Sequence, residues 1–454
     1  MGRVGLIGEN STKYVSILLD IWNNGDCAVL IDWRIPFRVA AEMMEEANVR
    51  RCFVDVQYYE KLPIDLHTSI EYIPFERRNY VAEILSENIR EKFKPRYSKN
   101  EAIVLYSSGT TGKSKGIILS HYAINTNADA IIDYMNPSPS DCMVIVKTIS
   151  HSSTLTGELL VALKSKMNLV ISPTIVPPRY ILNNIEKFCV SILCVNPTLL
   201  SIISDEISRA NYILKTLRRI YVSGSILSDT VYEKAHAIFY NIPIYNVYGL
   251  SEAGPRVTAQ RKECCKSNSV GKPIRNVSIA FVNENGGIVK NGECGILHVY
   301  SPSLFNGYIS GETKHKSLYM NWLNTGDIGY LDANGEIKIV GRSDDVIILD
   351  SHKIYPSEVE KQICKIANIS ECVVTKIDYS SSEFLACLYV GEITPEAVIR
   401  NTLKDKLLPY EIPRRFFRGE SLPRTLNGKI SMREIQKCII NKINKEKTCG
   451  NKHN

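Results

Sequence analysis

The sequence predicts an α/β protein with mostly parallel sheets and a small antiparallel section, followed by a small C-terminal α+β domain. Three observations predict it. Up to about residue 300, apolar runs of strand length alternate with stretches of helical spacing. From about residue 275, Asn-Gly pairs separate short segments of alternating polarity. After Asp344, a further set of helix and strand patterns begins, and a length of 454 residues suits two or three such units.

The first part of the chain alternates strands and helices in order. Val4–Ile7 and Ala28–Ile31 read as strands, and Tyr14–Trp22 and Val39–Ala47 read as helices. Because strands separated by helices form βαβ units, a mostly parallel sheet is expected. Apolar strand patterns return at Cys142–Lys147, Leu169–Ser172, Ile192–Val195 and Ile220–Ser223.

The antiparallel section and the C-terminal domain follow from different signals. Turns are expected at Asn285-Gly286, Asn291-Gly292 and Asn334-Gly335, with a strand at Ile337–Val340. Beyond them, helices are predicted at 356–366 and 395–406, and strands at 372–376 and 384–390. We therefore expect an N-terminal domain of residues 1–343 and a C-terminal domain of residues 344–454.

Composition narrows the classes of function. The net charge is +7, and the last 18 residues hold five lysines against one acidic residue, so the rest is nearly neutral and no nucleic acid partner is expected. The 13 cysteines are scattered without a CxxC pair, which favours reduced thiols and a cytoplasmic location. No run of about 18 uncharged apolar residues occurs, and the N-terminus lacks a signal-peptide apolar region, so no membrane span is expected.

A glycine-rich loop at Ser107–Gly116 is the most informative segment. Its glycines let backbone N–H groups approach phosphate oxygens, and its hydroxyls and lysines add hydrogen bonds and positive charge. It follows the strand Ile103–Tyr106 and precedes a helical stretch. Gly112-Lys113-Ser114 matches the end of a Walker A loop, but that motif requires glycine where Ser107 stands, which disfavours a P-loop kinase or ATPase.

The loop resembles the phosphate-binding loop of the adenylate-forming superfamily, which includes acyl-CoA synthetases, stand-alone adenylation domains and luciferases. Ser114 replaces the usual proline, which supplies no contact of its own. By this resemblance the first domain is an adenylate-forming domain, and the loop binds ATP through Ser107, Ser108, Gly109, Thr110, Thr111, Gly112 and Lys115.

Further segments resemble this family in the same order along the chain. Asn246–Glu252 is similar to the segment in which Tyr248 and Gly249 face adenine, Ser251 touches phosphate and Glu252 holds Mg²⁺. Ser223-Gly224-Ser225 resembles the adenine-side loop, and Thr325-Gly326-Asp327 the element whose carboxylate binds the ribose. The last two matches are Gly341–Asp345, with Arg342 near ribose or phosphate and Asp344 as hinge, and Pro423–Ile430, with Lys429 as catalytic lysine.

The resemblance implies two half-reactions. A carboxylic acid attacks the α-phosphate of ATP, giving an acyl-adenylate and pyrophosphate, and a thiol then displaces AMP. Thr110, Glu252 (through Mg²⁺) and Lys429 are the expected catalytic residues, because two anions must meet at phosphorus. The C-terminal domain is expected to act as a mobile lid that carries Lys429.

The acid and the acceptor remain open at the level of sequence. Thr148–Gly157 resembles the substrate-side segment, with His151 at the acid, and it contains no Asp, which argues against an α-amino acid. Arg256 is either a surface arginine or a partner for a second negative group on the acid. Coenzyme A and the phosphopantetheine of an acyl or peptidyl carrier protein are both candidate thiols. Ser351 stands where the family usually has glycine; by this resemblance the glycine lines the pantetheine tunnel, and a side chain as small as serine leaves thioester formation open.

Three functions therefore compete. The leading prediction is an AMP-forming acid–CoA ligase that uses ATP, Mg²⁺ and coenzyme A. The alternative is a stand-alone enzyme that loads the acid onto a carrier protein. A catalytically silent nucleotide-binding protein is disfavoured, because Glu252, Asp327, Arg342 and Lys429 are all retained.

Overall fold

The structure is a computed structural model of the chain. It describes residues 2–63, 69–76, 81–107, 115–210, 212–261, 269–311, 318–319, 321–349, 352–379, 382–425 and 430–450. Two compact units are distinguished: Met1–Ala280 with Leu297–Thr325 and Asp332–Ile337, and Phe281–Ile296 with Gly326–Leu331 and Lys338–Asn454. The predicted domain boundary at residues 343 and 344 stays a prediction.

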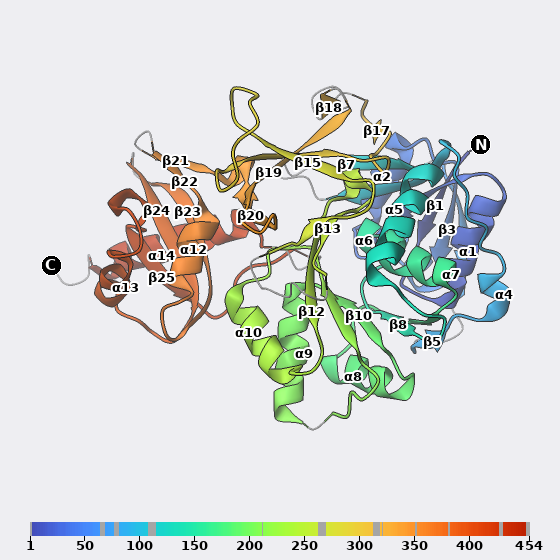
Figure 1. The fold of residues 1–454 in the computed structure, drawn as a ribbon, viewed down its shortest axis with the longest axis horizontal. Helices are drawn as coiled ribbons and strands as arrows, with labels where there is room; N and C mark the ends of the chain where they lie inside the picture. The colour runs from blue at the N-terminus through green and yellow to red at the C-terminus, as the bar shows by residue number, and fades with distance from the viewer. Residues whose placement is uncertain are drawn as a thin grey trace. The chain divides into compact units, whose positions relative to one another are not determined.

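The first sheet has seven strands, and its central strands are parallel because helices connect them (Figure 1). The strand Cys27–Ile31 is buried along its whole length, as apolar runs in a parallel sheet are. The strand order is β17 (Gly307–Tyr308), β7 (Lys115–Ser120), β6 (Glu101–Ser107), β2 (Cys27–Ile31), β1 (Arg3–Ile7), β3 (Arg51–Asp55) and β4 (Glu71–Phe75). The connecting helices are α1 (Thr12–Asn23), α2 (Phe37–Glu46) and α3 (Val56–Tyr59).

A strand that the sequence did not reveal separates the glycine-rich loop from the helical stretch expected after it. Residues 115–120 form strand β7, antiparallel to β6, and helix α5 (His121–Met135) begins only afterwards. The run Gly116–Leu119 is short, apolar and mostly buried, which suits a strand. Ser120 then caps α5, since its hydroxyl accepts a hydrogen bond from the backbone N–H of Ala123 at 3.1 Å.

The second sheet has eight strands, with parallel pairing from β12 to β9. Its order is β14 (Lys272–Pro273), β13 (Arg256–Ala259), β12 (Ile244–Gly249), β11 (Arg219–Val222), β10 (Ile192–Val195), β8 (Cys142–Ile145), β9 (Asn168–Ile171) and β5 (Glu83–Ile84). The helical segments around it are α4 (Glu87–Arg90), α6 (Ser152–Thr154), the π-helix η1 (Leu155–Leu160), α7 (Val161–Ser165), α8 (Pro178–Lys187), α9 (Pro197–Arg209), α10 (Asp229–Ile238) and the 3₁₀ turn η2 (Ser251–Ala253).

The third sheet contains the predicted Asn-Gly turns. Its strands are β15 (Ser278–Val282), β16 (Gly295–Tyr300), β18 (Leu318–Tyr319), β19 (Trp322–Leu331) and β20 (Ile337–Arg342). Strand β18 is antiparallel to β19. Gly286, Gly292 and Gly335 have φ of 80°, 89° and 70°, the left-handed region that Asn-Gly turns require.

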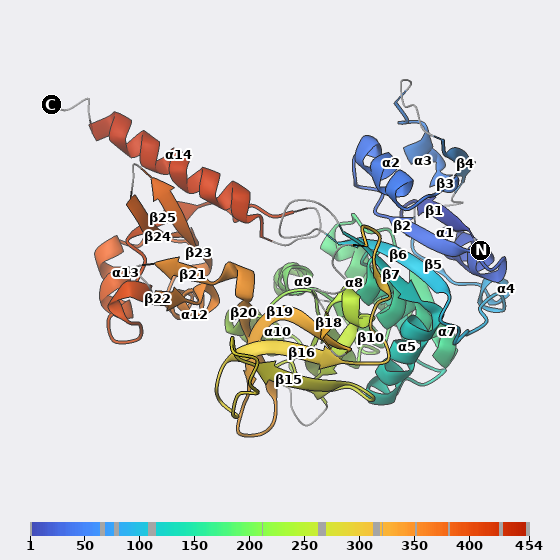
Figure 2. The same cartoon turned by 90° about the horizontal axis from the view of Figure 1, so that it is seen from above.

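The C-terminal α+β domain has a three-stranded sheet covered on both faces. Alternate residues of its strands divide between two cores: Val374 and Leu385 pack with α12, whereas Val373 and Leu388 pack with α14. Figure 2 shows α14 lying along this sheet. Its elements are η3 (Ser343–Asp345), β21 (Ile347–Leu349), β22 (His352–Ile354), α12 (Pro356–Ile363), β23 (Ile369–Tyr379), β24 (Ser382–Gly391), α13 (Glu396–Leu403), η4 (Pro409–Glu411), β25 (Arg415–Gly419) and α14 (Met432–Gly450). The predicted fold class is confirmed, since parallel sheets, an antiparallel pair and an α+β unit are all present.

Candidate nucleotide- and acid-binding site

The second sheet reverses its strand order between β8 and β10. The chain runs from β8 to β9 on one side and then adds β10, β11 and β12 on the other. Ligands of such sheets bind beyond the carboxyl ends of the strands, near the point of reversal. His151 follows β8, Ser223 follows β11, and Tyr248 is the second-to-last residue of β12, so three predicted segments lie at the same edge of one sheet.

Glu252 lies in the short turn η2 just after β12, and its side chain is held by a tyrosine that the sequence did not single out. The hydroxyl of Tyr308 donates a hydrogen bond to Oε1 of Glu252 at 2.9 Å. The backbone carbonyl of Glu252 accepts a hydrogen bond from Phe305 N at 2.9 Å. The ring of Phe305 packs edge-on against that of Tyr308, with centroids 4.9 Å apart.

Tyr308 also joins Glu252 to the end of the glycine-rich loop. Strand β17 pairs with β7, and Tyr308 lies opposite Ile117. The ammonium of Lys115 lies 5.5 Å from the centroid of the Tyr308 ring, within the range of a cation–π interaction. The Tyr308 side chain therefore contacts both Glu252, through its hydroxyl, and Lys115, through its ring.

Several predicted residues fall outside the described part of the chain. For Ser107 the backbone is described as the last residue of β6, but the side chain is not. The residues outside the described ranges are Ser108, Gly109, Thr110, Thr111, Gly112, Ser351 and Lys429. Their predicted roles stay predictions.

The other predicted nucleotide residues of the first unit lie at strand ends. Ser223 is buried, and Gly224 and Ser225 are exposed beside it. Tyr248 is half-buried. Gly249 permits the close return of the chain, because a Cβ there would lie 2.0 Å from the carbonyl oxygen of Pro255.

His151 lies beside a carboxylate from a distant part of the sequence. Its Nε2 is 4.0 Å from Oδ2 of Asp32, which directly follows β2. Arg34 Nε donates to Oδ1 of Asp32 at 2.9 Å. Burial alone would raise the pKa of Asp32, but the hydrogen bonds and charge of Arg34 outweigh it and lower that pKa. The carboxylate nearest His151 is thus ionised and already paired.

Ser152 and Asn10, whose contacts the sequence did not reveal, hold the acid-side segment in place. The hydroxyl oxygens of Ser152 and Ser251 are 2.8 Å apart and share a hydrogen bond, which joins the His151 segment to the Glu252 segment. Asn10 donates to the carbonyl of Lys147 at 2.8 Å and accepts from Ile149 N at 2.9 Å. No sequence motif marks these contacts, because each joins residues about a hundred or more positions apart.

The interpretation of Arg256 as a surface arginine is wrong. It is only 6% exposed, at the start of β13, and its backbone N–H and carbonyl are both bonded to the side chain of Asn127 at 2.9 Å. A Cβ on Gly157 would lie 3.2 Å from a terminal nitrogen of Arg256, which places the guanidinium against the acid-side segment. Nearby, Lys147 Nζ lies 2.9 Å from Oε1 of the buried Glu158.

The second unit brings its own two predicted ribose residues together. Arg342 Nε lies 3.5 Å from Oδ1 of Asp327, which is 9% exposed. Asp344 lies in the turn η3 and is exposed. Asp327 and Arg342 are thus neighbours, as joint contacts to one nucleotide require.

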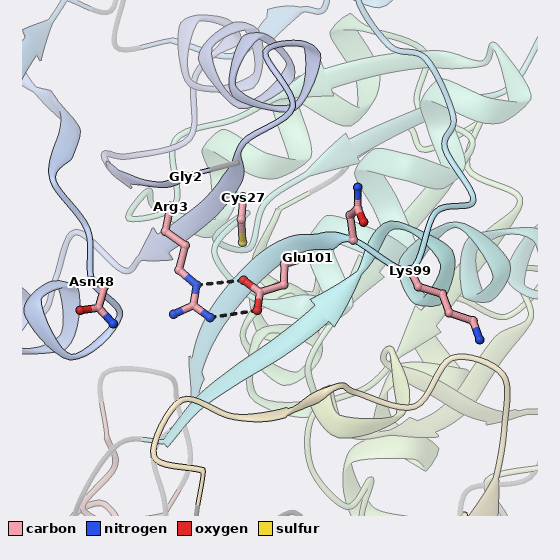
Figure 3. Close-up of a pocket in the computed structure, with 7 residues that line it drawn as sticks. Gly2, Arg3, Cys27, Asn48, Lys99 and Glu101 are labelled. Carbon is pink, nitrogen blue, oxygen red and sulfur yellow. Dashed lines mark hydrogen bonds and ion pairs between the residues drawn. The ribbon is translucent and has the colours of Figure 1, made fainter.

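A cavity of about 540 Å³ lies at an edge of the first sheet, and the predicted site residues do not line it. Its lining includes the first residues of β1, β2 and β6, so it opens at the amino ends of the parallel strands. Figure 3 shows Arg3 and Glu101 facing each other across it, joined by two hydrogen bonds of 2.9 Å. The lining residues are Gly2, Arg3, Cys27, Asn48, Lys99, Asn100 and Glu101. Its main charges already pair, and none of the predicted site residues lines it.

Within the described ranges of the chain, no group of three or more His, Cys, Asp or Glu side chains forms a metal site by itself. Among the helices of the same ranges, none has the length and apolar character needed to cross a bilayer.

Comparisons with known proteins agree with this arrangement. A family model described as AMP-binding enzyme matches residues 2–309. A 2-succinylbenzoate–CoA ligase of Bacillus mycoides is 27% identical over 96% of this chain and 88% of its own length. An indoleacetate–CoA ligase of Aromatoleum aromaticum is 24% identical over 98% of this chain and 90% of its own length.

Solved structures share the fold. ATP-bound MatB from Rhodopseudomonas palustris superposes with a TM-score of 0.84 at 20% identity, covering 96% of this chain and 88% of that one. The O-succinylbenzoate coenzyme A synthetase of Bacillus subtilis, in complex with ATP and magnesium ion, gives 0.78 at 22% identity, covering 94% and 88%. The resemblance inferred from the motifs is confirmed: the chain belongs to the AMP-binding enzyme family, and it is an AMP-forming ligase.

Proposed function

We propose that this chain activates an aryl or acyl carboxylic acid with ATP and transfers the acyl group to coenzyme A. The observation that carries the proposal is the convergence of three segments around Glu252: the exit strand of the glycine-rich loop through Tyr308, the His151 segment through Ser152, and the end of β12. The relatives named as 2-succinylbenzoate–CoA and indoleacetate–CoA ligases support an aryl acid and coenzyme A.

The proposed first step joins two anions. A carboxylate oxygen of the acid forms a bond to the α-phosphorus of ATP, and the bond from that phosphorus to the pyrophosphate oxygen breaks. The backbone N–H groups of residues 108–112 and the side chains of Thr110, Lys115 and Lys429 would bind the phosphates. Bound Mg²⁺ supplies positive charge at the phosphate oxygens. The Glu252 carboxylate suits this hard cation, which commonly takes only one or two protein carboxylates beside phosphate and water.

The proposed second step forms the thioester. The sulfur of the thiolate attacks the carbonyl carbon of the acyl-adenylate, and AMP leaves with the electron pair of the broken C–O bond. We propose that residues 344–454 form the lid that carries Lys429, with Asp344 at the hinge, and that the lid changes position between the two steps. The serine at position 351 bears on the second step alone.

Acid-dependent exchange of labelled pyrophosphate into ATP tests the first step, with a panel of aryl, aliphatic and amino acids. We expect exchange with an aryl or acyl acid and little with α-amino acids. The absence of exchange with every acid would contradict the proposal and favour a silent nucleotide-binding protein. Coenzyme A and a set of pantetheinylated carrier proteins are then supplied as acceptors. Release of AMP that depends on a carrier protein, and not on coenzyme A, would favour the loading enzyme instead.

A further inference from the structure

The buried side-chain atoms without a hydrogen-bond partner are concentrated at one place in the structure. Of the 11 such atoms among the described residues, five belong to four neighbouring side chains. They are Oγ1 of Thr154, Oγ1 of Thr156, both carboxylate oxygens of Glu158, and Nε of Arg256. The Glu158 carboxylate nevertheless has Lys147 Nζ 2.9 Å from its Oε1 and interacts with the Thr154 hydroxyl, so Oγ1 of Thr156 and Nε of Arg256 are the atoms that these contacts do not account for. Because leaving buried polar groups unpaired costs free energy, such a concentration needs an explanation, and a bound polar ligand is one.

These four residues and Lys147 form what we call the buried charge cluster. Arg256 is 6% exposed and Glu158 is 1% exposed. Lys147 approaches Glu158 to 2.9 Å, and the same carboxylate feels the positive charge of Arg256. Two cations therefore face one carboxylate, and burial works against ionisation of that carboxylate by raising its pKa. Tyr134, also beside Arg256, is kept neutral because burial raises the pKa of its hydroxyl to about 12. The cluster carries an excess of positive charge.

The cluster overlaps the acid-side segment, which supplies Thr154 and Thr156. Thr154, Thr156 and Glu158 all lie within the eight residues that follow His151. Leu155–Leu160 is a π-helix, a rare conformation that occurs frequently at functional sites. The start of the segment is tied to the Glu252 segment by the hydrogen bond between Ser152 and Ser251. Arg256 lies four residues beyond Glu252, and its guanidinium lies against Gly157 of the acid-side segment, since a Cβ there would lie 3.2 Å from a terminal nitrogen.

We propose that the acid substrate carries a second anionic group, a carboxylate, and that Arg256 binds it together with the hydroxyls of Thr154 and Thr156. This inference rests on the proposed function, because it places the reacting carboxylate of the same acid near His151. A planar guanidinium binds a carboxylate through two parallel hydrogen bonds, and threonine hydroxyls donate to the remaining oxygen lone pairs. Glu158 offsets part of the positive charge when the site is empty, which allows an arginine to remain buried there.

The test compares dicarboxylic acids with their own monoesters in the pyrophosphate exchange assay. Each monoester keeps the length and shape of the diacid and removes one charge. We use aliphatic and aryl diacids of graded length with the full-length chain. For the preferred length we expect kcat/KM to be roughly 10- to 100-fold higher for the diacid than for the monoester, as for a buried charged hydrogen-bonded pair.

Variants separate recognition from folding. Arg256→Met is expected to bring the ratio of diacid to monoester kcat/KM close to one, and Arg256→Lys, which keeps the charge, is expected to give an intermediate ratio. Arg275→Met is the matched control, because Arg275 is half-exposed and pairs with Asp133 on the surface; it should leave the ratio unchanged. Where Arg256→Met does not fold, Thr156→Val tests the same site and should lower the ratio by a smaller factor.

The outcomes of the inference and of the proposed function differ. If the wild-type enzyme exchanges pyrophosphate equally well with monoesters and diacids, the inference is overturned and the proposed function stands. The inference also fails if the ratio is high but survives Arg256→Met and Thr156→Val unchanged. If no acid of either kind supports exchange, the proposed function itself fails.

Discussion

At the scale of single residues, Tyr308 has a role that can be separated from its packing. Its hydroxyl bonds Glu252, whereas its ring contacts Phe305 and lies under Lys115. Tyr308→Phe removes only the hydroxyl. If Glu252 binds Mg²⁺ as proposed, losing a partner that orients a metal ligand should raise the Mg²⁺ concentration for half-maximal activity by roughly 10- to 100-fold. A Mg²⁺ titration of pyrophosphate exchange measures this.

Tyr300→Phe is the control, because Tyr300 is a partly exposed tyrosine of β16 whose ring lies against Trp322. Its Mg²⁺ dependence should match that of the wild type. A Tyr308→Phe enzyme with an unchanged Mg²⁺ dependence, or with an equal loss at every Mg²⁺ concentration, would contradict the orienting role.

At the scale of elements, helix α12 places the side-chain carboxylate of Glu360 against strand β23. Burial raises the pKa of Glu360 to about 7, although the backbone N–H of Val374 donates to it at 2.7 Å and lowers the pKa. The ordinary value is 4.5, so between these two values the folded chain holds a proton that the unfolded chain has lost. The free energy of unfolding should therefore be highest below about pH 4.5 for this group, fall as pH rises towards about 7, and level off above it. The loss is at most about 3 kcal/mol.

Glu360→Gln should remove this part of the pH dependence, since glutamine does not ionise. Urea unfolding of wild type and variant at about pH 5 and about pH 8 checks it, with Glu383→Gln on the surface of β24 as control. The variant should gain stability relative to wild type at the higher pH. An identical difference between the two proteins at both pH values would show that burial of Glu360 does not control the slope.

Periodicity in the sequence identifies buried apolar strands and amphipathic helices. The apolar runs at Ile192–Val195 and Ala28–Ile31 predicted β10 and β2 to within one residue, because strands buried on both faces leave a continuous apolar signal. Strand β7 is not identified from the sequence, since a short apolar run fits either a strand or a helix and its pairing with β6 is not visible there. The burial of Arg256 and the bonds of Tyr308 and Asn10 depend on contacts between distant segments, so no local pattern predicts them.

At the scale of the whole molecule, the two half-reactions place different demands on Lys429. Adenylation concentrates negative charge on the acid and the triphosphate, whereas thioester formation starts from an adenylate that has already lost pyrophosphate. If residues 344–454 form the proposed lid, the lid must bring Lys429 to the site for the first step and can move away for the second. Lys429→Ala should therefore lower acid-dependent pyrophosphate exchange at least about 100-fold, the scale for losing one preorganised donor. Thioester formation from chemically prepared acyl-adenylate, measured as AMP release with coenzyme A, should fall far less.

Lys437→Ala on the outer surface of α14 is the control for charge and should leave both steps unchanged. Equal losses in the two steps would mean that Lys429 serves a single arrangement of the chain throughout the reaction.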